Sequence, residues 1–179
     1  MSKPLRHGVL FDLDGTLVDS VYQHAFVWHD VLLDHGFCVP HWKVHRAIGL
    51  TSDRLLLWLL GHRPPQADAL IEAHSRRFLE LAASLQPTAG AKALLDDLEA
   101  RGVPFCAVTS ADPQTREALF RALGRELPLA ESPKQAPKPG AEPIEAGLRK
   151  LDLDPAQVTM VGDAIWDGEA ATRAGAHFI

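Results

Sequence analysis

Most of the hydrophobic residues of the chain lie in short continuous runs or in patterns with helical spacing. Three continuous runs cover residues 8–12, 104–109 and 158–162, and each consists mostly of consecutive apolar residues. Runs of this kind are typical of strands that are buried on both faces, as in a parallel sheet covered by helices. We therefore predict three parallel strands.

Helical patterns separate these runs from about residue 90 onward. In each pattern, apolar residues three or four positions apart share one face, and a glycine or an Asp-Pro pair marks the end of the helix. This alternation of strand and helix is the signature of βαβ units. The segment 125–140 contains four prolines and is predicted to be an irregular loop. The helical faces consist of Ala91, Leu94, Leu95 and Leu98, of Ala118, Leu119, Ala122 and Leu123, and of Ile144, Leu148 and Leu151.

Between residues 20 and 85 the apolar positions follow helical spacing, and no convincing strand pattern occurs. This stretch interrupts the alternation directly after the first predicted strand. We therefore predict a Rossmann-like, three-layer α/β core formed by residues 1–19 and 87–179, with an all-helical insertion at residues 20–86. The helical faces of the insertion consist of Val21, Ala25, Trp28 and Leu32, and of Ile71, Phe78, Ala82 and Leu85.

Composition and charge narrow the classes of function. The chain has 179 residues, 46% of them hydrophobic, and 18 Lys and Arg against 23 Asp and Glu give a net charge of −5. Because positive charge is not in excess, we expect neither nucleic acid nor a membrane surface as a partner, and the oligomeric state stays open. Cys38 and Cys106 lie far apart and indicate no disulfide framework. The first eight residues lack the apolar core of a signal peptide, and no apolar stretch reaches the roughly 20 residues that span a bilayer, so we expect a cytoplasmic protein.

Polar residues follow each predicted strand at its carboxyl end. Taken one at a time, they are equally typical of turns and helix caps. Ligands of open α/β sheets bind in the crevice at the carboxyl ends of the strands, so we expect one shared site. The candidates are Asp12, Asp14 and Gly15 after the first strand, Thr109 and Ser110 after the second, and Asp163 and Asp167 after the third.

The convergence of several carboxylates at one site calls for a compensating charge. Carboxylates about 4 Å apart repel one another by roughly 4 kcal/mol per pair at an effective dielectric constant of about 20. A divalent cation removes this repulsion, and a set of oxygen ligands selects Mg²⁺. The sequence therefore indicates a magnesium cofactor.

The order of these residues along the chain resembles one known family pattern. The segment 11–20 reads FDLDGTLVDS, and it is followed by Thr109, by Lys138 in the proline-rich segment, and by Asp163 and Asp167. This combination resembles the haloacid dehalogenase (HAD) superfamily, in particular its phosphatase-like members with a helical cap. The resemblance covers residues 8–176 and implies a HAD-like core, a cap at residues 20–86 and hydrolysis of a small phosphorylated metabolite.

The resemblance also implies catalytic roles. Asp12 would attack phosphorus and carry an aspartyl-phosphate intermediate, while Asp14 would protonate the leaving oxygen and then activate water. Thr109 and Lys138 would hold the phosphoryl oxygens, on which negative charge accumulates.

The same resemblance assigns ligands to the magnesium ion. Asp12, Asp163 and the backbone carbonyl of Asp14 would bind it, with Asp167 as an inner or outer ligand. The dehalogenases that name the superfamily need no metal and lack the second aspartate of the motif. Its presence here as Asp14 favours phosphate chemistry.

Residues of the insertion are expected to select the substrate. His24 and Thr51, together with Gly15 and Ser110 of the core, are the candidate substrate-binding residues. The local pattern around His24 is similar to that of β-phosphoglucomutase. A histidine that only packs beside Trp28 is an equally good interpretation.

Two alternatives to a phosphatase stay open. A β-phosphoglucomutase-like phosphosugar mutase binds a second phosphate, but this chain has Ser52 and Asp112 where that enzyme has Arg and Lys. The chain also stops at residue 179, where the family continues through a full strand and another helix. The resemblance therefore implies a C-terminus truncated relative to the family, and an inactive scaffold is the second alternative.

Overall fold

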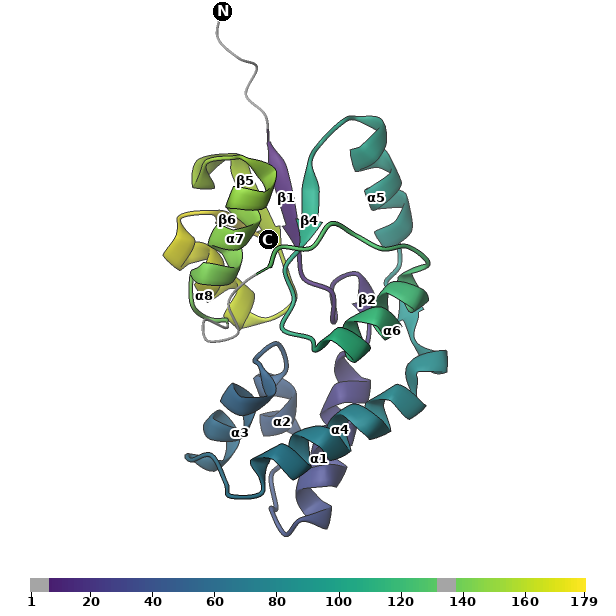
Figure 1. Ribbon diagram of the computed structural model, residues 1–179, viewed down its shortest axis with the longest axis vertical. Coiled ribbons are helices and arrows are strands. Elements are labelled where there is room, and N and C mark those ends of the chain that lie inside the picture. Colours follow the sequence, from purple (N-terminus) through teal and green to yellow (C-terminus); the bar gives the residue numbers. More distant parts are fainter. Residues whose placement is uncertain (1–6, 132–137) are drawn as a thin grey trace, which may run out of the picture.

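The computed structural model describes residues 7–131 and 138–179, which form an α/β part and a helical part (Figure 1). The α/β part is built on a parallel sheet of four strands in the order β4-β1-β5-β6. Three of these strands lie within the continuous apolar runs, so the predicted parallel strands are confirmed. The strands are β1 (Gly8–Phe11), β4 (Phe105–Ala107), β5 (Val158–Val161) and β6 (His177–Phe178).

Helices cover both faces of the sheet and complete three layers (Figure 1). Successive side chains of a strand point to opposite faces, and β1 shows this in its last two residues. Leu10 packs with helices on one side and Phe11 with helices on the other. The helices are α7 (Glu142–Leu151) and α8 (Ile165–Ala174) on the Leu10 side, and α5 (Ala91–Ala100) and α6 (Pro113–Leu123) on the Phe11 side.

One residue of the predicted helical faces lies elsewhere. Leu95 of α5 is completely buried, whereas Leu94 is 44% exposed. Consecutive residues of an α-helix are rotated by about 100°, which carries Leu94 away from the sheet. The prediction that Leu94 belongs to the buried face was wrong.

The helical part follows β1 in the sequence and has its own apolar core. Its helices pack around a cluster that includes Trp28, Val31 and Leu56, separate from the clusters on the sheet. The all-helical character predicted between residues 20 and 85 is confirmed for α-helices and one short 3-10 helix. The elements are α1 (Val21–Asp34), α2 (His41–Ala47), α3 (Ser52–Leu60), α4 (Ala67–Glu80) and η1 (Ala82–Ser84).

The last of these α-helices is shorter than its apolar pattern predicted. α4 ends at Glu80 and is followed by the 3-10 helix η1, so Ala82 and Leu85 do not continue its face. Leu85 is nevertheless buried, because the chain has already reached the α/β part and Leu85 packs in the same cluster as Phe11. The helical spacing of the apolar residues did not show that the helix ends before Leu85 or that Leu85 packs in the α/β part.

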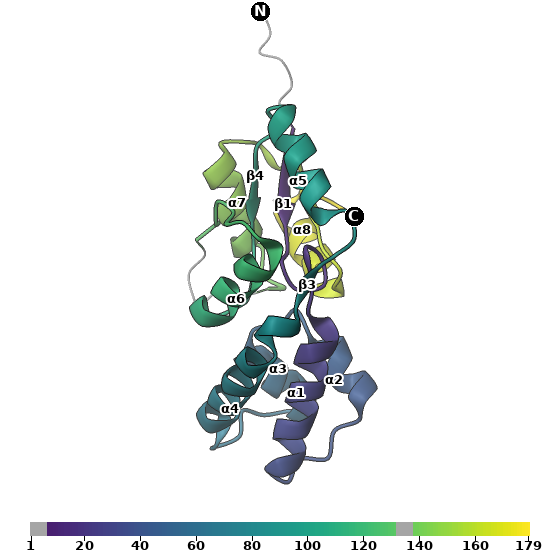
Figure 2. The same ribbon diagram turned by 90° about the vertical axis from the view of Figure 1, so that its right-hand side faces the viewer.

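A short antiparallel ribbon carries the chain into and out of the helical part (Figure 2). It consists of β2 (Val18–Asp19) and β3 (Gln86–Pro87), in which Val18 pairs with Pro87 and Asp19 with Gln86. The ribbon lies at the two ends of the insertion that the sequence predicted at residues 20–86. The division into domains at residues 20 and 86 itself stays a prediction.

Three contacts hold the helical part against the carboxyl ends of the strands. The Trp166 side chain of α8 lies in the apolar cluster of the helical part, and its Nε1 donates to the Arg46 carbonyl over 3.1 Å. Ser110 Oγ donates to the Gly49 carbonyl over 3.2 Å. Gly49 has a φ of +94°, and an added Cβ would lie 2.9 Å from the Ala164 Cβ. A side chain at position 49 would therefore push the two parts of the molecule apart.

The segment predicted as an irregular loop at 125–140 is only partly described. Its described beginning contains one isolated parallel bridge, between Leu129 and Ala107 of β4, where Ala130 N donates to the Ala107 carbonyl over 2.9 Å. Residues 132–137 lie outside the described residues. In the parts of the chain that the structure describes, no helix is both long and apolar enough to cross a bilayer.

Candidate active site

A cleft of about 550 Å³ lies between the strand ends of the α/β part and the helical part. The α/β part contributes polar side chains, among them two aspartates that follow β1. The helical part contributes an apolar wall and two histidines. The lining residues are Asp12, Asp14, Ser110, Ala111, Asp112 and Thr115 from the α/β part, and His24, Trp28, Ile48, Gly49, Leu50, Ser52, Leu55 and His74 from the helical part.

The first two aspartates reach the cleft because the chain stays extended just past β1. Asp12 N donates to the Val161 carbonyl over 3.0 Å, which ties this residue to the neighbouring strand β5. Asp12 and Asp14 both line the cleft, while Leu13 between them is fully buried in the apolar core. The predicted alternation of side chains therefore places both carboxylates at the same site.

Lys138 is a buried cation at the floor of this site. Its side chain is 1% exposed, and Nζ lies 2.6 Å from Asp12 Oδ1, 2.7 Å from Asp167 Oδ1 and 2.9 Å from the Val108 carbonyl. Burial alone lowers the pKa of Lys138, but the two carboxylates outweigh burial and hold its pKa above the ordinary value. The ammonium group therefore stays charged and joins the ends of β1 and α8.

The same burial acts on Asp12 in the opposite direction. Desolvation raises the pKa of Asp12 well above its ordinary value, and the nearby Asp167 and Asp14 carboxylates add to this, although Lys138 opposes it. A further positive charge at the site would favour the ionised form of Asp12. The electrostatics are thus consistent with the predicted need for a cation.

Three carboxylates converge at one point of the site. Asp12, Asp163 and Asp167 each offer one oxygen, and these oxygens lie within 4.8 Å of one another. Asp163 is exposed at the rim, yet partial burial of its carboxyl group and the nearby Asp167 raise its pKa to about 6. A donor set of carboxylate oxygens fits a hard divalent cation.

Gly15 belongs to this cluster through its backbone. Its φ of +77° lies in the left-handed region, and an added Cβ would collide with the Asp163 carboxylate. Only glycine lets the turn after Asp14 approach Asp163 so closely. The side chain of Asp14, in contrast, is not one of the three converging carboxylates.

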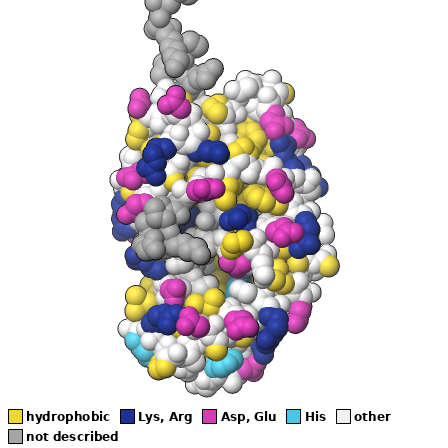
Figure 3. Space-filling model, viewed as in Figure 1, with side chains coloured by type: hydrophobic (Ala, Val, Ile, Leu, Met, Phe, Trp, Pro, Cys, Tyr) yellow, Lys and Arg dark blue, Asp and Glu magenta, His cyan; other side chains and the backbone are white. Residues whose placement is uncertain are grey.

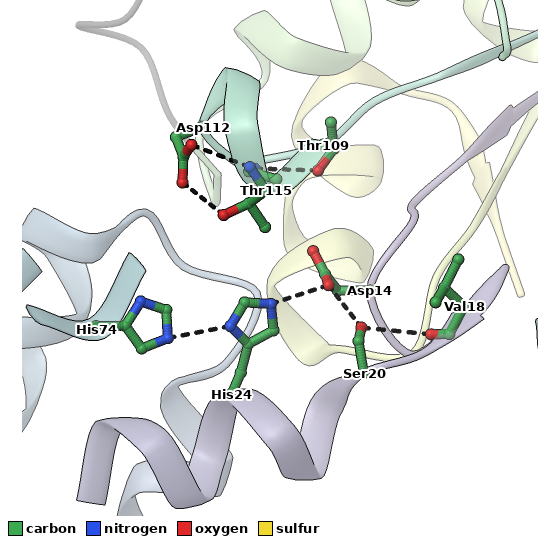
Figure 4. Close-up of polar contacts among 9 residues, drawn as sticks. Asp14, Val18, Ser20, His24, His74, Thr109, Asp112 and Thr115 are labelled. Atoms are coloured by element: carbon green, nitrogen blue, oxygen red, sulfur yellow. Dashed lines mark hydrogen bonds and ion pairs between the residues drawn. The ribbon is translucent and has the colours of Figure 1, made fainter. Parts of the chain in front are cut away.

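Asp14 is bound instead by side chains of the first helix (Figure 4). Its Oδ1 accepts from Ser20 Oγ over 2.6 Å and lies 3.0 Å from His24 Nε2. Burial raises the pKa of Asp14, but these two partners outweigh burial and bring its pKa below the ordinary value. The interpretation of His24 as a histidine that only packs beside Trp28 was therefore incomplete, because its ring also reaches the site.

The residues after β4 form a separate turn at the other side of the cleft (Figure 4). Thr109 Oγ1 accepts from Ala111 N over 3.0 Å, and Ser110 lines the cleft. Asp112 caps α6, since its Oδ1 accepts from Thr115 N over 3.1 Å and its Oδ2 from Thr115 Oγ1 over 2.7 Å. Neither Thr109 nor Lys138 is among the residues that line the cleft, although Lys138 lies directly behind Asp12.

The predicted site and the lining of the cleft differ at two places in the helical part. Thr51 was predicted to bind substrate, but its neighbours Leu50 and Ser52 line the cleft instead. His74 was not identified at all, although it lies between Ile71 and Phe78 on the apolar face of α4. A histidine at a core position of an amphipathic helix was the available signal, because such a polar group needs a partner when buried.

The comparisons with known proteins agree with this geometry. Residues 7–175 match the family model described as haloacid dehalogenase-like hydrolase. The chain belongs to the haloacid dehalogenase-like hydrolase family. The hydrolase is 31% identical to hexitol phosphatase A of Escherichia coli over 96% of this chain and 81% of that protein. It is 28% identical to an N-acetylmuramic acid 6-phosphate phosphatase of Pseudomonas putida over 93% of this chain and 78% of that protein.

A solved structure shows how closely the fold is shared. The crystal structure of a hydrolase from Pseudomonas syringae superposes with a TM-score of 0.92 at 29% identity, over 97% of this chain and 83% of that chain. The relatives in sequence are phosphatases, and the protein with the present sequence is a phosphatase of the same family. The predicted family, α/β fold and enzyme class are confirmed.

Proposed function

We propose that the protein is a Mg²⁺-dependent phosphatase that releases phosphate from a small phosphorylated metabolite through an aspartyl-phosphate on Asp12. One observation supports this proposal above all. The buried Lys138 ammonium joins Asp12 to Asp167 in the cluster that also contains Asp163, and Asp12 opens onto the cleft. A carboxylate is thus fixed beside a cation and beside the space for a substrate, as nucleophilic attack on phosphorus requires.

Each side chain has a defined task in this proposal. A carboxylate oxygen of Asp12 attacks phosphorus, and the alcohol oxygen of the substrate leaves with a proton from Asp14. Water then attacks the same phosphorus and gives a proton to Asp14. The bond between phosphorus and the Asp12 oxygen breaks, inorganic phosphate is released, and both aspartates are regenerated. Thr109 and Lys138 are assigned to the phosphoryl oxygens, and Lys138 also keeps Asp12 oriented.

A bound Mg²⁺ would be held by Asp12, Asp163 and Asp167, with the backbone carbonyl of Asp14 as a further ligand. When bound, the ion supplies positive charge that offsets the carboxylates and the phosphate. Gly15 keeps the motif backbone close enough to Asp163 for such a shared site.

The helical part is proposed to act as a cap, residues 20–86, that selects the substrate. Its contribution to the cleft is mainly apolar, apart from Ser52 and the two histidines. On the face in Figure 3, side chains of both charges are interspersed rather than gathered into one basic area. These features favour a small metabolite over a nucleic acid as substrate. Ser110, Gly15 and His24 remain the proposed substrate contacts, with Ser52 in place of Thr51.

A panel of phosphate esters tests the proposed function. We expect phosphate release from at least one small phosphomonoester when Mg²⁺ is present, and loss of this activity when a chelator removes the metal. Phosphate release is measured with a colorimetric assay, and sugar phosphates are also followed by NMR for isomerisation. Isomerisation without phosphate release would contradict the phosphatase and favour the mutase. No reaction with any ester would favour the inactive scaffold.

The residues that line the cleft make the mutase the weaker candidate. Among the described residues of the lining there is no Lys or Arg, and Asp112 and Ser52 occupy the places where a second phosphate would need cations. We therefore expect the NMR spectra to show release without isomerisation.

Metal binding is expected to stabilise the protein more as the pH rises. The Asp163 carboxyl group has a pKa raised to about 6, so protons compete with the cation below that pH and not above it. A ligand at about 100 times its Kd adds about 2.7 kcal/mol of stability. The shift of the melting temperature on adding Mg²⁺ should therefore be larger at about pH 8 than at about pH 5. The variant Asp163→Asn should show a smaller difference between the two pH values, although the raised pKa of Asp12 remains. An equal shift at both pH values in the unmodified protein would contradict the assignment.

A further inference from the structure

A line of hydrogen bonds leaves the cleft and enters the helical part (Figure 4). It begins at Asp14 Oδ1, which lies 3.0 Å from His24 Nε2, and continues from His24 Nδ1 to His74 Nε2 over 3.1 Å. His24 is 8% exposed and His74 is 5% exposed. Asp14 belongs to the loop after β1, whereas the histidines come from α1 and α4, so the line crosses from one part of the molecule to the other.

Aromatic packing fixes the planes of both imidazole rings. The His24 ring stacks on Phe78 with centroids 3.7 Å apart and an angle of 5° between planes. The His74 ring stacks on Trp28 with centroids 4.2 Å apart and an angle of 12°. Because both rings are held in this way, the hydrogen bonds depend on which nitrogen carries the proton.

The direction of the hydrogen bonds follows from Asp14. Asp14 Oδ1 also accepts from Ser20 Oγ, and a proton that Asp14 gives to the substrate lies on Oδ2, so the hydrogen between Asp14 and His24 lies on His24 Nε2. The second ring nitrogen of His24, Nδ1, is hydrogen-bonded to His74 Nε2. Burial and the neighbouring His24 lower the pKa of His74 well below its usual value, which keeps His74 a neutral imidazole.

In this arrangement, one carboxyl oxygen of Asp14 is bound by protein side chains, and the other is available to the substrate or to water. Two side-chain partners of Asp14, Ser20 Oγ and His24 Nε2, both bind Oδ1. Oδ2 is therefore the oxygen that can exchange a proton with a leaving group or with water. If the Nδ1 of His24 lost its partner, the ring could turn within its plane, and Nε2 would no longer be directed at Oδ1.

We infer that His74 is a positioning residue for Asp14, which acts by holding His24 Nε2 against Asp14 Oδ1 and so orienting the carboxyl group toward the substrate. This inference rests on the proposed function, in which Asp14 protonates the leaving oxygen. A proton donor such as Asp14 matters most when the leaving oxygen is strongly basic. An alkyl phosphate needs the proton, whereas p-nitrophenyl phosphate releases an acidic phenol and needs it little.

The test compares these two substrates in three variants. His74→Phe keeps an aromatic ring on Trp28 but removes both nitrogens, while His74→Gln provides an amide that can donate to His24 Nδ1. His45→Phe is the matched control, since His45 is exposed on α2 and stacks on Tyr22 away from the cleft. Melting temperatures establish that each variant is folded.

We expect His74→Phe to lower kcat for glycerol phosphate by about 10- to 100-fold with little change in KM, a part of the 10²- to 10⁴-fold that general acid catalysis supplies. For p-nitrophenyl phosphate the loss should be less than about threefold. His74→Gln should recover most of the lost activity, and His45→Phe should behave like the unmodified protein. An equal loss on both substrates, or no recovery with Gln, would overturn the inference.

The same experiment separates this inference from the proposed function. If the unmodified protein hydrolyses neither ester with Mg²⁺, the proposed function fails. If it hydrolyses both and Asp14→Asn affects them equally, the acid role of Asp14 is wrong and the inference falls with it. If Asp14→Asn is selective for the alkyl ester but His74→Phe is not, only the role of His74 is wrong.

Discussion

Replacing Asp12 with Asn is expected to abolish phosphate release while the protein stays folded. The amide has the shape of the carboxylate but cannot form the aspartyl-phosphate, so kcat should fall by about 10⁴-fold or more. Lys138 keeps its contacts with Asp167 and with the Val108 carbonyl. Because burial already disfavours the ionised form of Asp12, we expect the stability to change by less than about 2 kcal/mol.

Phosphate release and the midpoint of urea unfolding measure the two parts of this prediction. Asp19→Asn is the matched control, because Asp19 belongs to the same sequence motif but is exposed in the ribbon strand β2. The control should keep its activity. Turnover close to that of the unmodified protein in Asp12→Asn would show that another group attacks phosphorus.

The parts of the site that the sequence predicted are those fixed by a strand and its immediate continuation. Asp12 and Asp14 both reach the cleft because they are two positions apart, which is one period of an extended chain, with Leu13 buried between them. Asp163 and Asp167 come together with Asp12 because β5 lies beside β1 in the sheet. Parallel strands bring their carboxyl ends to one edge, so local patterns were sufficient here.

Residues of the helical part depend on packing that no local pattern contains. His24 and His74 meet only because α1 and α4 lie side by side, and the sequence separation of 50 residues carries no sign of this. Ser52 lines the cleft instead of Thr51 because the preceding turn, with Gly49 in the left-handed region, touches the loop at Ala164. The direction of such a loop follows from a contact between parts of the molecule, which sequence periodicity does not describe.

The role of Lys138 could not be predicted from local sequence patterns either. As a lysine in a proline-rich segment it was indistinguishable from a surface residue, and only the resemblance to a family singled it out. The structure gives the physical reason for its presence, because the ammonium group is buried between two carboxylates. We expect its removal to have the largest effect on stability among single substitutions at the site.

The substitution Lys138→Met removes the charge and keeps a long apolar side chain. Asp12 and Asp167 are then buried without a cation, which should cost about 3–5 kcal/mol at neutral pH and lower kcat by about 10²-fold or more. Burial raises the pKa of Asp12 and the substitution removes the Lys138 charge that opposes this, so the variant binds more protons when folded than when unfolded. Its loss of stability should therefore shrink as the pH falls from about 8 to about 5.

Urea unfolding at both pH values measures this effect, with Lys150→Met as the control because Lys150 is exposed at the end of α7.

Adding Asp12→Asn to Lys138→Met removes one of the two unpaired charges. The double variant should therefore be more stable than Lys138→Met alone, with a coupling of about 0.5–3 kcal/mol between the two positions. Additive effects at neutral pH would mean that Lys138 is held by something other than these carboxylates. If the double variant regains stability that Lys138→Met alone has lost, the ion pair with Lys138 is what allows a carboxylate to be buried at position 12. The same ion pair then makes this carboxylate available as the nucleophile.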